Sequence, residues 1–230
     1  MRERRSSSGA PQLFFTEKDV EDICEEALRA QGYYPASPQR VNIDRFVEKR
    51  FNVSPQFEHM HPGVLGYSKF GPKGMVSMHI SEALVSDANL AAERRVSTTL
   101  AHEAGHGLMH AQLFVLPDYD STLFGHNEDV EGQKILCRDE KTVERRKYDG
   151  RWWELQANMA IGPLLMPKKL VHDSLRPFLL SRGTFGIEEI DPKRREEAAR
   201  HLATTFDVNP AVARIRIEKL YKPAGPQLTL

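Results

Sequence analysis

The sequence lacks the features that would assign it to a membrane or to an oxidising compartment. Among its 230 residues are two cysteines, Cys24 and Cys137, which form no C-x-x-C pair and predict reduced thiols without a structural disulfide. No apolar run approaches the roughly 18 residues of a membrane span. The first residues also lack the apolar segment of a secretory signal. We therefore expect a cytoplasmic protein with no membrane partner.

Neither sign of charge is in excess. Lys and Arg together number 32, as do Asp and Glu, so no overall field favours nucleic acid, an anionic membrane or a polyanionic substrate. Apolar residues make up 40% of the chain and charged residues 28%, which is typical of a globular protein with one large or two small domains. Any specific partner must be recognised by a local feature.

One short motif carries recognisable chemistry. His102 and His106 are four residues apart, so on a helix they share one face and can bind one metal ion. Glu103 is rotated by about 100° from His102, which leaves its carboxylate beside the open position of the metal. This is the H-E-x-x-H arrangement of zinc-dependent hydrolases. A histidine pair used for packing would show the same spacing, so the motif needs support from elsewhere.

The motif falls inside a long predicted helix. Asp87 or Asn89 can cap its start, and its core positions recur at helical spacing: Val96, Leu100, Ala104 and Leu108. Gly105 and Gly107 each cost about 1 kcal/mol relative to alanine inside a helix. We explain both glycines by the close approach of another element. His110 continues the histidine face; we expect it to support a ligand or face the substrate, and a plain surface role is the alternative.

A second predicted helix, starting at Trp152, supplies a candidate third ligand. Glu154 and Asn158 lie at positions i and i+4 of one face, so Glu154 can bind the metal while Asn158 orients a ligand histidine or the bound water. Ala157 and Ala160 are small enough for close packing against the glycine-bearing helix. The alternative is an amphipathic helix with a solvated Glu154 and four apolar residues in the core: Trp152, Trp153, Leu155 and Met159.

Periodicity elsewhere predicts an α+β fold. Residues 1–15 are aperiodic and predict a flexible tail. Helices are expected from Thr16 to about Gly32 and from Asn42 to Phe51, followed by a small antiparallel sheet between Val53 and Ser81. Residues 117–150 lose periodicity, and we interpret them as a flap over the cleft.

The final third predicts further helices. One is expected from Lys168 to Leu180, followed by a turn over Ser181 to Gly186. Two more, Arg194 to Phe206 and Pro210 to Leu220, resemble a helix-turn-helix. Between residues 192 and 222 there are eight Lys or Arg against four Asp or Glu, an excess of four (8 − 4). This small excess favours packing on the rest of the protein over DNA binding.

Taken together, two motifs resemble the ImmA/IrrE family of zinc metallopeptidases. The first runs from Thr99 to His106, with Leu108 and His110 following; the second is Glu154-Leu155-Gln156-Ala157-Asn158, continuing to Leu164-Leu165-Met166-Pro167. The resemblance covers residues 16 to about 222. It implies a mostly helical zincin-like metallopeptidase domain over residues 16–180 and a helical segment packed on it over residues 181–230.

The resemblance also implies roles for individual residues. His102, His106 and Glu154 would bind one Zn²⁺ per chain, with Mn²⁺ as an alternative, and Glu103 would be the catalytic acid and base. The oxyanion formed during peptide hydrolysis needs a further donor, for which the candidates are His110, Tyr119 and His126. The two motifs are 48 positions apart (154 − 106), longer than expected for the family, which bears on the flap and on substrate choice.

Three classes of function follow. Family members belong to mobile-element or stress-response systems and cut helix-turn-helix repressors, so the resemblance predicts a peptidase acting on a repressor-like protein or an antitoxin. The second class is a zinc-containing transcription regulator whose C-terminal helices bind DNA, through residues such as Arg214 and Arg216. The third is a toxin-antitoxin component that binds its partner without cutting it.

Overall fold

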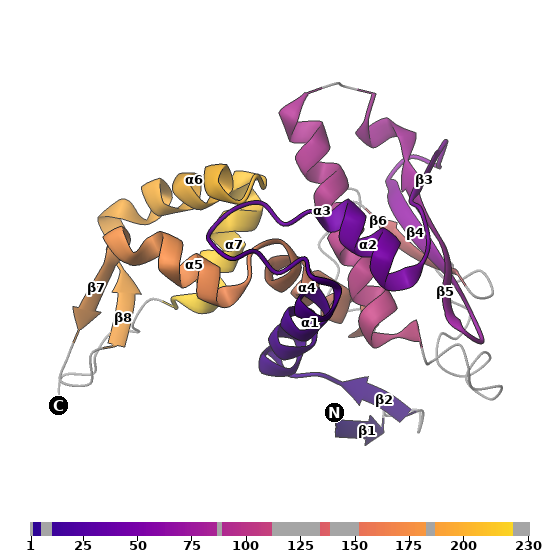
Figure 1. The fold of residues 1–230 in the computed structure, drawn as a ribbon, viewed down its shortest axis with the longest axis horizontal. Coiled ribbons are helices and arrows are strands. Elements are labelled where there is room, and N and C mark those ends of the chain that lie inside the picture. Colours follow the sequence, from indigo (N-terminus) through magenta and orange to yellow (C-terminus); the bar gives the residue numbers. More distant parts are fainter. Residues whose placement is uncertain are drawn as a thin grey trace.

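The fold is α+β. The computed structural model describes six stretches of the chain: residues 2–5, 11–86, 89–111, 134–138, 152–182 and 187–222. A four-stranded sheet with helices α2 and α3 lies at one end of the molecule, helices α5 to α7 lie at the other, and α1 and α4 lie between them (Figure 1). Within the described ranges, no helix is long and apolar enough to cross a membrane.

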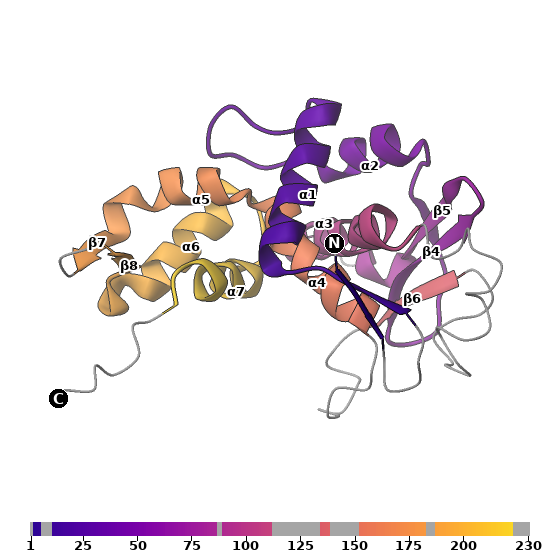
Figure 2. The same ribbon diagram turned by 90° about the horizontal axis from the view of Figure 1, so that it is seen from below.

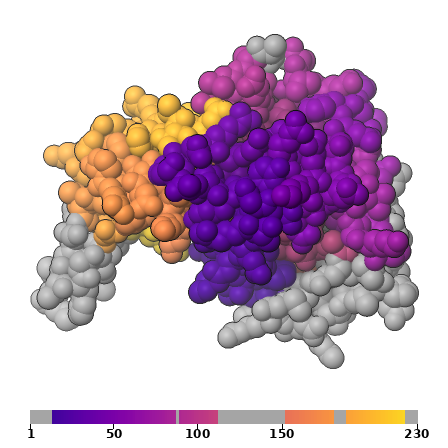
Figure 3. Space-filling view, in the orientation of Figure 1, coloured from indigo at the N-terminus to yellow at the C-terminus, as the bar shows by residue number. Residues whose placement is uncertain are grey.

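The first two helices were predicted from their caps and apolar spacing, and both are confirmed. Helix α1 (Glu17–Gln31) begins with a capping box in which Thr16 and Asp19 bond each other's backbone N–H. It ends at Gly32, whose φ of +78° suits glycine. Helix α2 (Ile43–Phe51) buries the three residues expected to face inward, Ile43, Phe46 and Val47. The segment that contains both helices covers the front of the molecule between its two ends (Figure 3).

The four-stranded sheet has the order β3-β5-β4-β6. Strands β4 (Val64–Gly71) and β5 (Gly74–Ser81) form the predicted antiparallel hairpin. The expectation of a wholly antiparallel sheet is wrong, because β3 (Gln56–Glu58) pairs in parallel with β5. It skips β4, its neighbour in sequence, and lies on the other side of β5, so β3 and β4 run in opposite directions. Strand β6 (Lys134–Arg138) pairs antiparallel with β4.

Strand β6 comes from within the predicted flap, so part of residues 117–150 belongs to the sheet. The rest of that segment lies outside the described residues. The predicted N-terminal tail likewise contains two paired strands, β1 (Arg2–Arg5) and β2 (Pro11–Phe14). Short paired strands without apolar alternation give little signal in a sequence.

Two helices carry the candidate ligands. Helix α3 (Leu90–Met109) starts at Asn89, whose side chain accepts a hydrogen bond from the Ala92 N–H at 3.0 Å, and packs against the sheet. Helix α4 (Trp152–Leu165) packs along α3 and also contacts α1 and α7. Figure 2 shows α3 and α4 together near the centre of the molecule, between the sheet and the C-terminal helices.

The C-terminal region differs from expectation at two points. The helix predicted to reach Leu180 ends at Leu175, as α5 (Lys168–Leu175), because Pro177 cannot continue it. The chain then forms strand β7 (Leu179–Arg182), paired with β8 (Ile187–Ile190). Ser181 and Arg182 of the expected turn therefore belong to a strand, and the rest of that turn lies outside the described residues. Helices α6 (Arg195–Thr205) and α7 (Pro210–Leu220) are confirmed as helices.

Candidate metal centre

The site lies where α3 and α4 come closest. A Cβ atom on Gly105 would lie 2.9 Å from the Cβ of Ala160 and 3.2 Å from the backbone of Ala157. The prediction that small residues let these helices approach is therefore confirmed for Gly105. It is wrong for Gly107, where an added Cβ would meet the ring of Phe51 and the side chain of Met75, from α2 and β5. The Gly105 contact brings α4 within reach of the histidines on α3.

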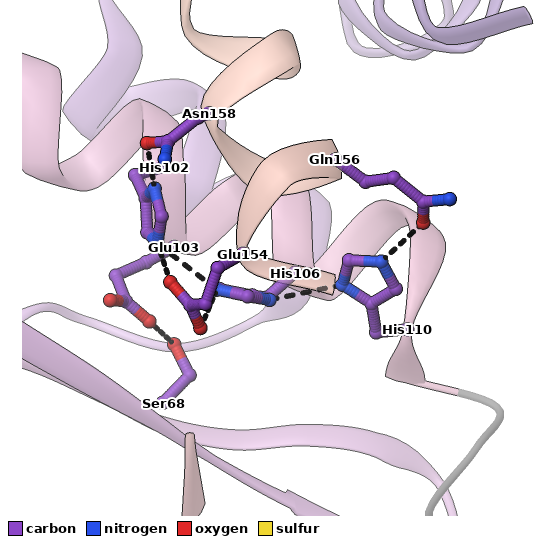
Figure 4. Close-up of polar contacts among 8 residues, drawn as sticks. All are labelled: Ser68, His102, Glu103, His106, His110, Glu154, Gln156 and Asn158. Atoms are coloured by element: carbon purple, nitrogen blue, oxygen red, sulfur yellow. Dashed lines mark hydrogen bonds and ion pairs between the residues drawn. The ribbon is translucent and has the colours of Figure 1, made fainter. Parts of the chain in front are cut away.

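His102, His106 and Glu154 converge at this contact (Figure 4). The Nε2 atoms of the two histidines are 3.0 Å apart, and the Glu154 oxygens lie 3.2 Å from Nε2 of His102 and 3.3 Å from Nε2 of His106. Zinc bonds of about 2.0–2.1 Å in tetrahedral geometry separate neighbouring donors by roughly 3.4 Å. The two Glu154 distances run to different oxygens, and one ligand atom from each residue lies within 4.8 Å of the others, so the three side chains can hold a single zinc ion.

Buried oxygens without partners support that fit. Oε1 of Glu154 and Oε1 of Glu103 are both buried and accept no hydrogen bond, an arrangement that costs free energy unless a cation or a donor satisfies them. Oε1 of Glu154 faces His106 at 3.3 Å, but not with hydrogen-bond geometry. A metal ion bound by His102, His106 and Glu154 would satisfy the free oxygen of Glu154, and a water on that ion could donate to the free oxygen of Glu103.

The ionisation states also suit metal binding. Burial lowers the pKa of His106 and so favours the neutral imidazole. Burial alone would raise the pKa of Glu154, but the neighbouring His106 and His102 outweigh it, so the pKa is lowered and the ionised carboxylate is favoured. Neutral imidazoles and an ionised carboxylate are the forms that bind zinc.

Glu103 lies beside the three donors but is held differently. It is fully buried, and Oγ of Ser68 on β4 donates a hydrogen bond to its Oε2 at 2.6 Å. Burial raises the pKa of Glu103 to about 7, although the charge of His102 and the Ser68 hydrogen bond act in the opposite direction. A carboxyl group with this pKa can both take up and release a proton near neutral pH.

Ser68 was missed by sequence reasoning. Its role depends on β4 packing against α3, and Gly66 leaves room for that packing: an added Cβ there would lie 2.8 Å from the backbone oxygen of His79 and 3.0 Å from Thr99 of α3. Gly66 and Ser68 share one face of the strand. The available signal was this alternation of a glycine and a small hydroxyl residue.

Two side-chain amides of α4 contact histidines of the α3 region. Oδ1 of Asn158 lies 3.0 Å from Nδ1 of His102, the kind of contact proposed for it from its i+4 spacing. His110 is fully buried, so the surface role is wrong for it. Its Nδ1 lies 3.0 Å from Nδ1 of His106, and its Nε2 lies 2.9 Å from Oε1 of Gln156, a residue that sequence reasoning missed (Figure 4).

The interpretation of α4 as an ordinary amphipathic helix is wrong. Leu155, assigned to the core in that case, is 54% exposed, whereas the Glu154 side chain is only 18% exposed and faces the histidines. Trp152 and Trp153 are buried as both interpretations required. Tyr119 and His126, the other candidate oxyanion donors, lie outside the described residues.

The two arginines considered for DNA contact are engaged within the protein. Arg216 is buried and donates from Nε to the Met166 carbonyl at 3.0 Å and from both terminal nitrogens to the Glu21 carboxylate. Arg214 donates to Glu196 at 2.6 and 2.8 Å.

Chemically, the arrangement combines three side chains that could hold a metal ion with a buried carboxyl group that can exchange protons. Two helices supply the donors, and the sheet supplies the hydroxyl group that holds Glu103. No model of a known protein family matches the chain, and no curated protein shows a significant match to it in sequence.

Proposed function

We propose that the protein is a zinc-dependent peptidase of the ImmA/IrrE type, in which His102, His106 and Glu154 hold the metal and Glu103 is the catalytic acid and base. The observation that carries this proposal is the convergence of the three residues, with one ligand atom from each within 4.8 Å of the others. The mixed nitrogen and oxygen donor set suits zinc, and manganese is an alternative because one donor is a carboxylate.

A bound zinc ion would polarise a peptide carbonyl and lower the pKa of a coordinated water to about 7. The chain's own contribution is to hold and move one proton. Ser68 fixes Oε2 of Glu103 and leaves Oε1 without a protein partner. Oε1 can therefore accept the proton of the attacking water and later give it to the leaving amine.

We further propose, from the resemblance alone, that the substrate is a repressor-like regulatory protein or an antitoxin in a mobile-element or stress-response system. The zincin-like domain over residues 16–180 and the helix-turn-helix-like segment over residues 181–230 belong to the same proposal. The four residues, 206–209, between α6 and α7 are consistent with a helix-turn-helix. DNA binding by Arg214 and Arg216 gains no support, because both are paired with carboxylates.

The test is cleavage of a repressor-like protein with a helix-turn-helix, supplied as the candidate substrate. Zinc-loaded wild type should yield two fragments, and Glu103→Gln should slow cleavage by about 10²–10⁴-fold while retaining zinc, because the variant loses only the proton carrier. Glu93→Gln is the matched control, since Glu93 is an exposed carboxylate on the same helix. Cleavage by Glu103→Gln at the wild-type rate would refute the proposed mechanism.

A further inference from the structure

A chain of three buried side chains leads away from the metal centre. His106 Nδ1 lies 3.0 Å from His110 Nδ1, and His110 Nε2 lies 2.9 Å from Gln156 Oε1 (Figure 4). Both histidines are fully buried, and Gln156 is nearly so. Neither His110 nor Gln156 is among the three residues that could hold the metal. Their buried contacts nevertheless connect α4 to a candidate ligand on α3.

The direction of these hydrogen bonds is fixed by the groups involved. A neutral imidazole has one N–H and one acceptor nitrogen, and an amide oxygen can only accept. Nε2 of His110 must therefore carry the proton and donate to Gln156 Oε1. Nδ1 of His110 is then an acceptor, so the proton of His106 lies on Nδ1. Nε2 of His106 is left with a lone pair.

That lone pair faces the donor cluster, since Nε2 of His106 is the atom 3.0 Å from His102 and 3.3 Å from Glu154. We infer that Gln156 is a positioning residue: acting through His110, it keeps the proton of His106 on Nδ1 and presents Nε2 to the metal. The inference rests on the proposed metal site and deepens it.

The reversed amide orientation would undo this arrangement. An N–H of Gln156 pointing at His110 Nε2 would place the His110 proton on Nδ1, where it would meet His106 Nδ1 as a donor. The proton of His106 would then move to Nε2 and block the lone pair that the metal requires. His102 needs no such intermediate, because Asn158 Oδ1 lies directly at its Nδ1, 3.0 Å away.

The experiment measures proton positions and zinc affinity separately, on the full chain. Nitrogen NMR of metal-free protein labelled with ¹⁵N-histidine shows which ring nitrogen of each histidine carries the proton, and competition with a chelator gives the affinity for zinc. The variants are Gln156→Met, which is similar in size but has no comparable acceptor, and Gln156→Glu, which keeps the acceptor. Circular dichroism checks that each variant is folded.

In wild type we expect the proton on Nδ1 of His106 and on Nε2 of His110. Gln156→Met should mix these tautomers and weaken zinc binding by about 10–100-fold, as loss of a group supporting a ligand typically does. Gln156→Glu should restore both properties to near wild type. A purely packing role for Gln156 would give no such rescue and no change in tautomer.

A wild-type proton on Nε2 of His106 would overturn the inference, and this measurement does not depend on whether any variant folds. Unchanged zinc affinity and tautomers in Gln156→Met would overturn it as well. Failure of the proposed function is distinguishable from failure of this inference. A wild type that shows the expected tautomers and binds zinc but cleaves no protein would refute the peptidase function and still support the role of Gln156.

Discussion

Two clusters of buried polar side chains differ in how completely their hydrogen-bonding groups are paired. At the interface of α3 and α4, two imidazoles face a carboxylate, and buried oxygens of Glu103 and Glu154 have no partner. At the interface of α7 with α1 and α4, the buried guanidinium of Arg216 donates from all three nitrogens to Glu21 and the Met166 carbonyl. The first cluster is incomplete and the second is complete.

This difference is the one expected between a ligand-binding site and a contact that only stabilises the fold. A buried polar group without a partner is costly, and such a group persists where a ligand satisfies it. A buried charge that is fully paired needs no ligand, and removing its partner lowers the free energy of unfolding. Arg216 also packs against Gly162 of α4, 3.0 Å from the position of a Cβ there, so it holds the C-terminal helices to the helix that carries Glu154.

The largest effect on stability should come from the complete cluster. In Glu21→Ala the Arg216 side chain, only 1% exposed, keeps its charge but loses its carboxylate partner, and we expect a loss of about 3–5 kcal/mol in the free energy of unfolding. Urea denaturation measures this loss. A change as small as that of an exposed ion pair would show that the link is not structural.

The incomplete cluster should instead make stability depend on pH. The pKa of Glu103 rises from 4.5 to about 7 on folding, so the folded state binds the proton more tightly than the unfolded state. Stability of the metal-free protein therefore falls as pH rises from about 4.5 to about 7, by about 3 kcal/mol from this group. Urea denaturation with a chelator present should show Glu103→Gln equal to wild type near pH 5 and more stable near pH 8. Parallel pH profiles would contradict the raised pKa of the buried Glu103 carboxyl group.

Separating the two helices should weaken both packing and metal binding. In Gly105→Ala the new methyl group would lie 2.9 Å from Ala160 Cβ, and we expect a loss of about 2 kcal/mol in stability from overpacking, together with weaker zinc binding. Gly107→Ala is the control, because its methyl group meets Phe51 and Met75, away from α4. If both variants bound zinc equally well, the Gly105 contact would not be what positions Glu154.

The smallest effect is expected from an exposed ion pair on the same helix as Arg216. Arg214 is 47% exposed and bonds Glu196, which is 48% exposed, so water already solvates both charges and their attraction adds little. Arg214→Ala should leave the midpoint of urea denaturation unchanged within error. A loss as large as that of Glu21→Ala would remove the contrast between buried and exposed pairs on α7.

Local signals in the sequence were enough for much of the fold. Thr16 and Asn89 mark the starts of α1 and α3, and helical spacing placed Glu154 and Asn158 on one face of α4. What could not be predicted depends on contacts between distant segments. Ser68 is 35 residues from Glu103, and Gln156 is 46 residues from His110. Neither pair has a spacing that a helix or a strand would reveal.

The sheet, too, could be predicted only in part from the sequence. The hairpin of β4 and β5 follows from alternation and a short turn, but the parallel pairing of β3 with β5 skips a strand and has no local signature. Strands β7 and β8 were missed because each has only four residues. Pro177, which ends the preceding helix, was the available sign that the helical pattern could not continue.

The central claim, that the α3 and α4 cluster is a metal centre, is tested most directly by zinc stoichiometry. Equilibrium dialysis of the purified full chain, followed by elemental analysis, should give one zinc ion per chain for wild type and for Glu103→Gln, and none for the double variant His102→Ala, Glu154→Ala. A wild type that binds no zinc, or a double variant that binds as much as wild type, would contradict the account.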